Sequence, residues 1–437
     1  MLTIAYLANQ FPCPVEPYVG EEIEELRRRG IRVITGSVRR PSEHGDAVST
    51  GELAPEVVLQ SIGFNIPVRA AWLCLRRWPK ISSLVRRVMF RGREGLFTRL
   101  KALLHTLLGA CYAVLLDGQQ VEHIHVHHGY FGSWIGMVAA RLLDVGCSMT
   151  LHGSDLLLRA AYLDAKLENC TFCLTVSEYN KQYIHEHYAH VNQQKVVVSR
   201  LGVEVADRID TSAPLQKTEA KLTLLAVGRL HPVKDHAFLV KACAQLQANN
   251  LNFECLIAGD GPEKRSLELL IQQGGLDERI TLLGHVPRQQ MDSLYDRADV
   301  VLLTSRSEGI PLVLMEAMAR GKVVLAPSIT GIPELVIAGK TGFLYEPGSL
   351  DDFVRRLLFI HSLIHISGCN SFCSDGIHPK LLPAACQLDW VRHAARAQVR
   401  HNFNRKRNLE TFGDLFLSRV TPRSESLPHE NFILQQI

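Results

Sequence analysis

The sequence lacks an uncharged apolar run long enough to cross a membrane. Its longest such run, Ala102–Leu116, lies between Lys101 and Asp117 and is shorter than the roughly 18–20 residues that a spanning helix needs. The first residues, MLTIAYLANQF, also lack a cationic segment ahead of their apolar run, so they predict a buried strand and not a signal peptide. We therefore expect a cytoplasmic chain without a transmembrane helix.

A large excess of either charge is also missing. The formal net charge is only +4 across 437 residues, which disfavours a nucleic-acid-binding protein. The chain has 11 cysteines, an odd number, and most lie in apolar runs, as Cys111, Cys147 and Cys255 do. We expect them to be small core residues in a reducing compartment.

The motifs of several cofactor sites are absent. No Asp-x-Asp pair occurs, which disfavours a site that holds a diphosphate through a metal between two aspartates. No Gly-x-Gly-x-x-Gly occurs either, so a nicotinamide dinucleotide is weakly supported. Cys369, Cys373 and Cys386, with His365 and His378 nearby, could in principle bind zinc, but their spacing fits no standard zinc pattern. We predict no metal and no cofactor.

The chain does contain a regular alternation of short apolar runs and amphipathic stretches. This alternation is typical of α/β proteins whose parallel sheets carry helices on both faces. A helix is expected over Glu21–Arg29. The strands expected in the first half are Thr3–Leu7, Arg32–Thr35, His123–Val126, Ser148–Leu151, Phe172–Val176 and Lys195–Ser199.

The polar segment 201–220, which carries Pro214, predicts a linker between an N-terminal domain, 1–200, and a second domain, 221–388. Within the second domain, segment 363–388 fits the alternation poorly, and helices with a tail are expected over 389–437. The other elements expected there are strands at Lys221–Val227, Phe253–Ala258, Ile280–Leu283, Val300–Leu303 and Val323–Ala326, helices at Ala237–Asn249, Glu263–Gln273 and Pro311–Arg320, and a turn with a short hairpin at Gly339–Pro347.

The strongest local signal is Ser307-Glu308-Gly309-Ile310-Pro311, which leads from a strand into a helix. Free backbone N–H groups at such a helix start suit a phosphate. Glu308 and Glu316 could accept hydrogen bonds from sugar and ribose hydroxyls. The alternative is that Glu308 caps the helix and that Glu316 is solvated.

Two more loops follow expected strands, at the edge where open α/β sheets bind ligands. Gly228 and Arg229, with Lys234, place a glycine turn and two cations there, which could hold a diphosphate or form a solvated loop. His152 follows another strand and either reaches into a site or is merely exposed, with Ser154 or Asp155 capping the next helix.

Taken in order, these motifs resemble retaining glycosyltransferase family 4, densely over roughly residues 220–350. Phe11-Pro12 near the start, and His123–Gly129 followed by Leu151–Asp155, are similar to exopolysaccharide and colanic-acid-type members. The motifs that carry the resemblance are Gly228-Arg229 with Lys234, Gly259-Asp260-Gly261-Pro262, Glu308-Gly-x-Pro with Glu316-Ala-Met-Ala, and Gly331-x-Pro-Glu.

The resemblance implies the GT-B fold, in which two Rossmann-like domains face each other across a cleft, with a C-terminal helix packing back toward the N-terminal domain. It implies transfer of a sugar from a nucleotide-diphosphate donor to a saccharide or lipid-linked saccharide acceptor, with retention of configuration, in polysaccharide biosynthesis. The resemblance also implies a role for each residue of the site. Arg229 and Lys234 neutralise the diphosphate, Glu316 binds ribose, Glu308 and His152 lie near the transferred sugar, and Gly228, Gly309, Ile310 and Pro311 bind the donor.

Two alternative functions stay open, a sugar-nucleotide 2-epimerase of the same fold and a catalytically silent partner in a polysaccharide assembly complex.

A basic segment of the N-terminal half bears on where the protein is located. Between Arg69 and Lys101 there are ten Lys and Arg residues against one acid, Glu94, with Trp72, Trp78, Phe90 and Phe97 interleaved. This pattern predicts that the N-terminal domain rests on an anionic membrane surface, at the inner face of the cell membrane. Alternatively, the segment is a solvated basic helix pair whose apolar residues face the core.

Overall fold

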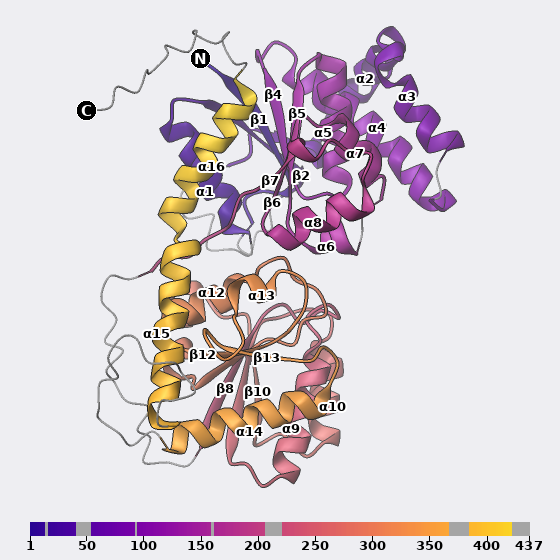
Figure 1. Cartoon of the computed structure of the whole chain (residues 1–437). Helices are drawn as coiled ribbons and strands as arrows, with labels where there is room; N and C mark the ends of the chain where they lie inside the picture. The colour runs from indigo at the N-terminus through magenta and orange to yellow at the C-terminus, as the bar shows by residue number, and fades with distance from the viewer. Residues whose placement is uncertain are drawn as a thin grey trace, which may run out of the picture.

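The computed structural model describes residues 1–13, 16–40, 54–91, 94–158, 161–205, 221–366 and 384–421. These residues form two α/β domains, one above the other in Figure 1, and each is built on one parallel sheet. The expected fold class is therefore confirmed.

The N-terminal sheet has seven strands in the order β3-β2-β1-β4-β5-β6-β7, all paired in parallel. Strands β1, β4 and β5 are almost fully buried, because helices cover both faces of the sheet. The strands are β1 (Thr3–Gln10), β2 (Arg32–Arg39), β3 (Val57–Val58), β4 (His123–His127), β5 (Gly146–Leu151), β6 (Phe172–Thr175) and β7 (Val196–Val198). Its helices are α1 (Pro17–Arg28), α2 (Asn65–Arg76), α3 (Trp78–Phe90), α4 (Leu96–Leu116), α5 (Phe131–Leu143), α6 (Ser154–Leu157), α7 (Leu163–Asn169) and α8 (Glu178–His187).

The second sheet has six parallel strands in the order β10-β9-β8-β11-β12-β13. One of its cores joins Leu224, Phe253 and Phe353, and the other lies on the opposite face around Val301 and Met315. The strands are β8 (Leu222–Val227), β9 (Phe253–Ala258), β10 (Ile280–Gly284), β11 (Val300–Leu302), β12 (Val323–Pro327) and β13 (Phe343–Tyr345). The helices are α9 (His236–Ala248), α10 (Lys264–Gln273), α11 (Arg288–Arg297), α12 (Leu312–Ala319), α13 (Ile332–Leu335) and α14 (Leu350–Ile366).

Two C-terminal helices, α15 (Ala384–Asn402) and α16 (Arg405–Val420), run along both domains and appear in yellow in Figure 1. Ala395 and Val399 of α15 belong to the core of the second domain, whereas Phe412 and Phe416 of α16 belong to the core beneath α1. The expected return of a C-terminal helix to the N-terminal domain is therefore present.

The structure differs from two sequence-based expectations about elements, and it describes only the ends of a third segment. Residues 343–345 form no hairpin, because they pair in parallel with β12 as an edge strand. Segment 363–388 is helical at both ends, since α14 continues to Ile366 and α15 begins at Ala384; residues 367–383 lie outside the described part. Helix α12 begins at Leu312, with Pro311 at the preceding capping position in an extended conformation.

Helix α4 is the one helix among the described residues that is long and apolar enough to cross a membrane. Length and composition alone are weak evidence, because a core helix of a soluble protein has the same properties. Gly109 of α4 packs so closely against α5 that a Cβ there would lie 2.7 Å from Val138 Cβ. Part of α4 therefore belongs to the core of the N-terminal domain.

Candidate active site

Each sheet has a switch point, where the strand order reverses, and the expected site residues of the second domain lie beside the switch point of the second sheet. In the second sheet the reversal falls between β8 and β11. The loop with Arg229 and Lys234 follows β8, and the loop with Glu308 follows β11. Ligands of open α/β sheets bind outside the carboxyl ends of strands at such a point.

The loop after β8 is held by the turn Gly259-Asp260-Gly261-Pro262. A Cβ on Gly259 would lie 1.9 Å from Gly228 O, and a Cβ on Gly261 would lie 2.4 Å from Leu230 O. The backbone of the turn can approach this closely only because glycine has no side chain. The turn is therefore a support for the cationic loop, a role that the sequence did not indicate.

Lys234 and Glu308 lie together. Lys234 Nζ is 2.5 Å from Glu308 Oε1, and both side chains are partly buried. The carbonyl of Lys234 accepts a hydrogen bond from Thr304 Oγ1 at 2.9 Å, which ties the cationic loop to the end of β11. Arg229, in contrast, is exposed. The sequence predicted separate ligands for Lys234 and Glu308, whereas in this structure each side chain neutralises the other.

Glu316 is not a freely solvated helix residue. Its Oε2 accepts a hydrogen bond of 2.7 Å from the hydroxyl of Tyr295, a fully buried side chain of α11. Burial, together with the negative charge of Glu316, raises the pKa of Tyr295 well above its usual value, so the hydroxyl keeps its proton and donates it. Tyr295 therefore fixes the position of one Glu316 oxygen.

The two domains meet through backbone at two glycines, Gly153 and Gly309. A Cβ on Gly309 would lie 2.0 Å from His152 O, and a Cβ on Gly153 would lie 2.7 Å from Gly309 N. On the other side of the same loop, a Cβ on Gly331 would lie 2.2 Å from Gly309 O. The Glu308–Gly309 backbone thus passes between Gly331 and the His152–Gly153 loop of the N-terminal domain.

Asp155 braces the loop that carries His152. Its carboxylate accepts hydrogen bonds from the backbone N–H groups of Gly153 at 2.7 Å, Gly129 at 2.9 Å and His152 at 3.1 Å. Asp155 therefore organises the loop, and the N-cap position of α6 is Gly153, which has no side chain to cap with. Asn180 donates a further hydrogen bond of 2.8 Å to His152 O.

A buried cation lies next to His152. The Nε2 atom of His128 is 3.0 Å from the carboxylate of Glu16, and its Nδ1 atom is 3.6 Å from that of Asp155. Although burial favours the neutral ring, these two carboxylates raise the pKa of His128 to about 10. Burial, followed by the charge of His128, lowers the pKa of His152 well below its usual value. At neutral pH His128 is therefore a cation and His152 is neutral.

Further contacts link the domains near the site. Glu334, at the end of the Gly331-x-Pro-Glu turn, accepts hydrogen bonds from the backbone N–H groups of Glu178 and Tyr179 at 3.1 and 2.8 Å. These are the first residues of α8, where a carboxylate is favoured by the helix dipole. Arg200 lies 3.3 Å from Glu334. The sequence flagged this turn but did not predict an interdomain contact for Glu334.

The structure thus brings together four of the predicted site residues, His152, Lys234, Glu308 and Gly309. Glu316 lies on α12, eight residues after Glu308, and Arg229 is exposed next to Gly228. Ile310 and Pro311 are buried where the loop enters α12. Sequence reasoning missed Tyr295 and Asn180, the interdomain contact of Glu334, and the contacts that surround His152. The hypothetical zinc ligands Cys369, Cys373 and His378 lie outside the described residues, as do the side chains of His365 and Cys386.

Comparison with known families matches both halves of the chain in order. The family described as "Glycosyltransferase Family 4" matches residues 15–207, and the family described as "Glycosyl transferases group 1" matches residues 207–363. The boundary between the two matches falls in the segment that joins the two sheets.

Several individual proteins are similar. A protein named putative colanic acid biosynthesis glycosyltransferase WcaL, of Salmonella typhimurium, is 36% identical over 39% of this chain and 43% of its own length. A UDP-Gal:alpha-D-GlcNAc-diphosphoundecaprenol alpha-1,3-galactosyltransferase of Escherichia coli is 28% identical over 56% of this chain and 67% of its own length. The match to the first of these relatives thus spans less than half of its length.

A solved structure of Anabaena Alr3699/HepE with UDP-glucose shares the fold, with a TM-score of 0.67 at 17% identity, over 96% of this chain and 100% of that one. At this identity the likeness concerns the fold alone. The two matched families, both of glycosyltransferases, together span residues 15–363 of one GT-B fold, which supports a glycosyltransferase of the family 4 type.

Proposed function

We propose that this protein transfers a sugar from a nucleotide-diphosphate donor to a saccharide acceptor carried on a lipid, with retention of configuration, in polysaccharide biosynthesis. The observation that carries the proposal is the pairing of Lys234 with Glu308 at the switch point of the second sheet, against the His152 loop of the other domain. A diphosphate is a stronger partner for Lys234 than one carboxylate, so donor binding would free Glu308 for the sugar hydroxyls.

The residues at the carboxyl edge of the second sheet fit binding of a diphosphate without a metal ion. Arg229 and Lys234 would supply the positive charge that the departing diphosphate needs. The departing phosphate would take the proton of the acceptor hydroxyl, so the proposal assigns no protein side chain as general base. The lipid-linked acceptor is suggested by the relative named for transfer to a GlcNAc-diphosphoundecaprenol.

A thermal-unfolding panel with UDP, GDP, ADP and their sugars tests the proposal first. One nucleotide class should raise the melting temperature, because a ligand at about 100 times its Kd adds about 2.7 kcal/mol to the free energy of unfolding. With that donor radiolabelled in the sugar, label should appear on a lipid-linked acceptor, and chelator should leave the rate unchanged. Conversion of the donor sugar without acceptor would identify an epimerase, and binding without transfer would identify a silent partner.

We further propose that helices α2–α4 rest on an anionic lipid surface. The four aromatic side chains singled out in this segment do not face the core: Trp72 is 60% and Phe97 71% exposed, and Trp78 and Phe90 are exposed as well. In α4, Leu96, Leu100 and Leu104 are also exposed, at a spacing that puts them on one helical face. The side chains that would enter the lipid therefore form stripes on the surface.

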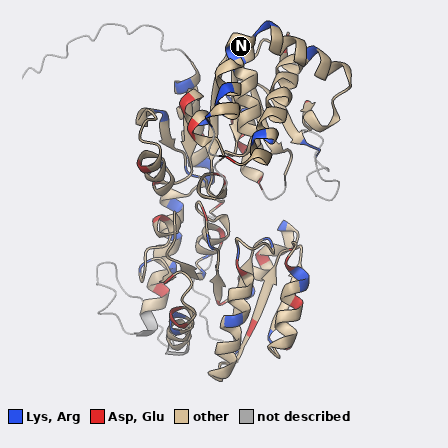
Figure 2. Cartoon of the chain, turned by 90° about the vertical axis from the view of Figure 1, so that its right-hand side faces the viewer, with Lys and Arg blue, Asp and Glu red and all other residues tan. Residues whose placement is uncertain are grey.

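The charge of these helices favours an anionic surface. In Figure 2, where they face the viewer, blue dominates over red. Several cations are already paired, Arg77 and Lys80 with Asp144, and Arg87 with Asp164. Arg76 lies over the ring of Trp72 at 5.3 Å and has no acidic partner among the described residues. Each free Lys or Arg near anionic lipid contributes roughly 1 kcal/mol of attraction.

Co-sedimentation with vesicles of phosphatidylcholine and increasing phosphatidylglycerol tests the membrane proposal. Binding should rise with the anionic lipid and fall in high salt, and Trp72→Ser combined with Phe97→Ser should weaken it at least several-fold. Phe359→Ser is the matched control, because Phe359 is an exposed aromatic residue on α14 of the other domain. Wild-type protein that stays in the supernatant with strongly anionic vesicles at low salt would refute the proposal.

A further inference from the structure

Three histidines alternate along β4 and so point to the same side of the sheet, beneath α1 and α16. His123 and His125 are enclosed: both bond to Ser148 Oγ at 2.7 Å, and their rings contact Phe416 of α16. His127, at the carboxyl end of the strand, differs from them because its contacts lead to Glu22 and to His152. The end of this row therefore touches the candidate active site.

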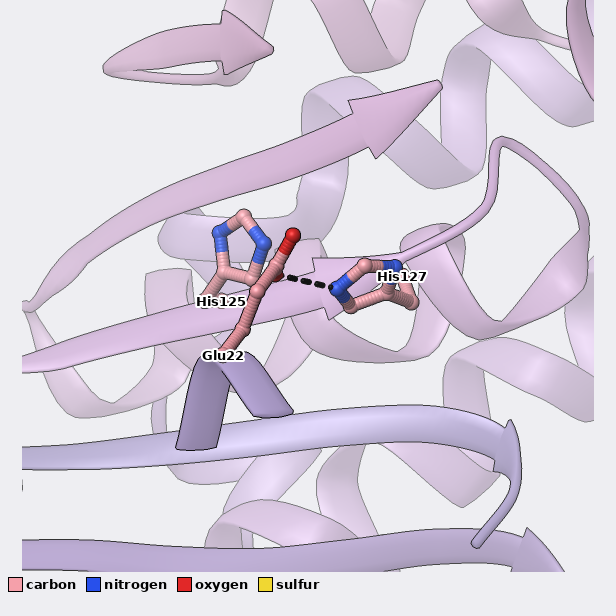
Figure 3. Close-up of side chains that lie close together, drawn as sticks. All are labelled: Glu22, His125 and His127. Carbon is pink, nitrogen blue, oxygen red and sulfur yellow. Dashed lines mark hydrogen bonds and ion pairs between the residues drawn. The ribbon is translucent and has the colours of Figure 1, made fainter. Parts of the chain in front are cut away.

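Glu22 reaches His127 from α1. Figure 3 shows its side chain extending from the helix toward β4, with the interaction to His127 dashed. Glu22 Oε2 lies 2.8 Å from His127 Nε2, and both side chains are buried. The hydroxyl of Tyr6 bonds to the same Glu22 oxygen and lies 2.6 Å from His127 Nε2. The buried carboxylate of Glu22 thus has two partners, Tyr6 and His127.

These contacts determine which nitrogen of His127 carries its proton. Tyr6 has one hydroxyl proton and donates it to the carboxylate, since burial and the charge of Glu22 raise its pKa well above the usual value. Nε2 of His127 then faces two oxygen acceptors, so it must carry a proton. We take His127 to be a neutral imidazole, in which the other nitrogen, Nδ1, is left as an acceptor.

The order of donors and acceptors continues into His152. Its Nε2 lies 3.1 Å from Nδ1 of His127, and because that atom is an acceptor, His152 must donate. His152 is neutral, as shown above, so its only ring proton is on Nε2. Its Nδ1 makes no hydrogen bond to the described residues and is left with a free lone pair. The ring also packs at a tilt against Tyr18, with 4.8 Å between centroids, which restricts its orientation.

We propose that Glu22 and His127 are positioning residues that hold His152 in the Nε2–H tautomer, so that Nδ1 accepts a hydrogen bond from a hydroxyl of the transferred sugar. The same geometry that places His152 O against Gly309 then leaves Nδ1 of its ring as an acceptor, while Nε2 donates to His127. The role of Nδ1 rests on the proposed function, whereas the tautomer itself does not.

A metal site is the competing interpretation of the same cluster. One ligand atom from each of Glu22, His125 and His127 lies within 4.8 Å of the others. However, the two ring nitrogens of His125 are taken by Ser148 and Thr150, at 2.7 and 3.0 Å, and the Tyr6 hydroxyl contacts both Glu22 and His127. A hydrogen-bonded relay accounts for every one of these contacts without an ion.

The first test is ¹⁵N NMR of histidine-labelled protein without ligand, with the His152 signals assigned by their loss in His152→Gln. In wild type, His152 should carry its proton on Nε2. In Glu22→Gln, whose amide can donate as well as accept, and in His127→Phe, the Nδ1–H form should appear. Glu25→Gln is the matched control, because Glu25 is also a buried carboxylate of α1 but pairs with Arg28 and Arg29. A wild-type Nδ1–H tautomer, or one unchanged in both variants, overturns the proposal.

The second test is kinetic and uses the nucleotide sugar identified by the thermal panel. Glu22→Gln should lower kcat by on the order of 10-fold, as loss of an orienting partner commonly does, with KM for the donor nearly unchanged. Glu25→Gln should match wild type. Equal loss in both variants would show a merely structural role for Glu22. Stoichiometric zinc in purified protein that disappears in Glu22→Gln would establish the metal site instead. Absence of any transfer would refute the proposed function and leave the tautomer measurement decisive.

Discussion

Replacing Lys234 with alanine should lower turnover by about 10²-fold or more, because Lys234 would stabilise the negative charge that develops on the departing diphosphate. The side chain is well placed for this, since its backbone is anchored by Thr304 and its ammonium group lies beside Glu308. Steady-state kinetics with the identified donor measures the effect. Lys241→Ala is the control, because Lys241 is an exposed lysine on α9 of the same domain.

Arg229→Ala should have a similar but not additive effect, since both cations would act on one diphosphate. The effect of the Lys234→Ala, Arg229→Ala double variant should therefore be smaller than the product of the single effects. Because Lys234→Ala leaves Glu308 without its cation, melting temperatures of all variants must be compared. Near-normal turnover in a folded Lys234→Ala protein would remove Lys234 from the site.

Gly309→Ala is expected to have the second large effect, a fall in kcat/KM on the order of 10²-fold, as displacement of reacting groups by about 1 Å can cause. The added methyl would lie 2.0 Å from His152 O and 2.9 Å from the side chain of Val176, both in the other domain. The domains can relieve this overlap by separating without unfolding. We therefore expect a nearly unchanged melting temperature and a larger radius of gyration by small-angle X-ray scattering.

Gly95→Ala serves as the control for that substitution, because a Cβ at Gly95 would meet no atom within 4 Å and its φ is −64°. Wild-type kinetics in Gly309→Ala would mean that the close approach of Gly309 to His152 is not needed for turnover.

Much of the fold could be predicted because strand and helix patterns are local. Strand Phe253–Ala258 was expected with the bounds observed, and most other strands were expected within a few residues. The hairpin at 339–347 failed because Phe343–Tyr345 pairs in parallel with the preceding strand β12, across a connection through α13, and not with a strand inside 339–347. The exposure of Trp72 and Phe97 was likewise undecided, since an amphipathic stretch does not reveal which of its faces meets another helix.

The candidate site was likewise predictable from the sequence only in part. The sequence by itself determined that His152, Arg229, Lys234 and Glu308 each follow a strand, because a short apolar run with a glycine turn after it is a local pattern. Only the tertiary structure decided that Lys234 pairs with Glu308 and that Gly309 lies against His152. It alone also joined Glu22 to His152 through His127. Such contacts depend on strand order and on the placement of one domain against the other, and no spacing along the chain encodes either.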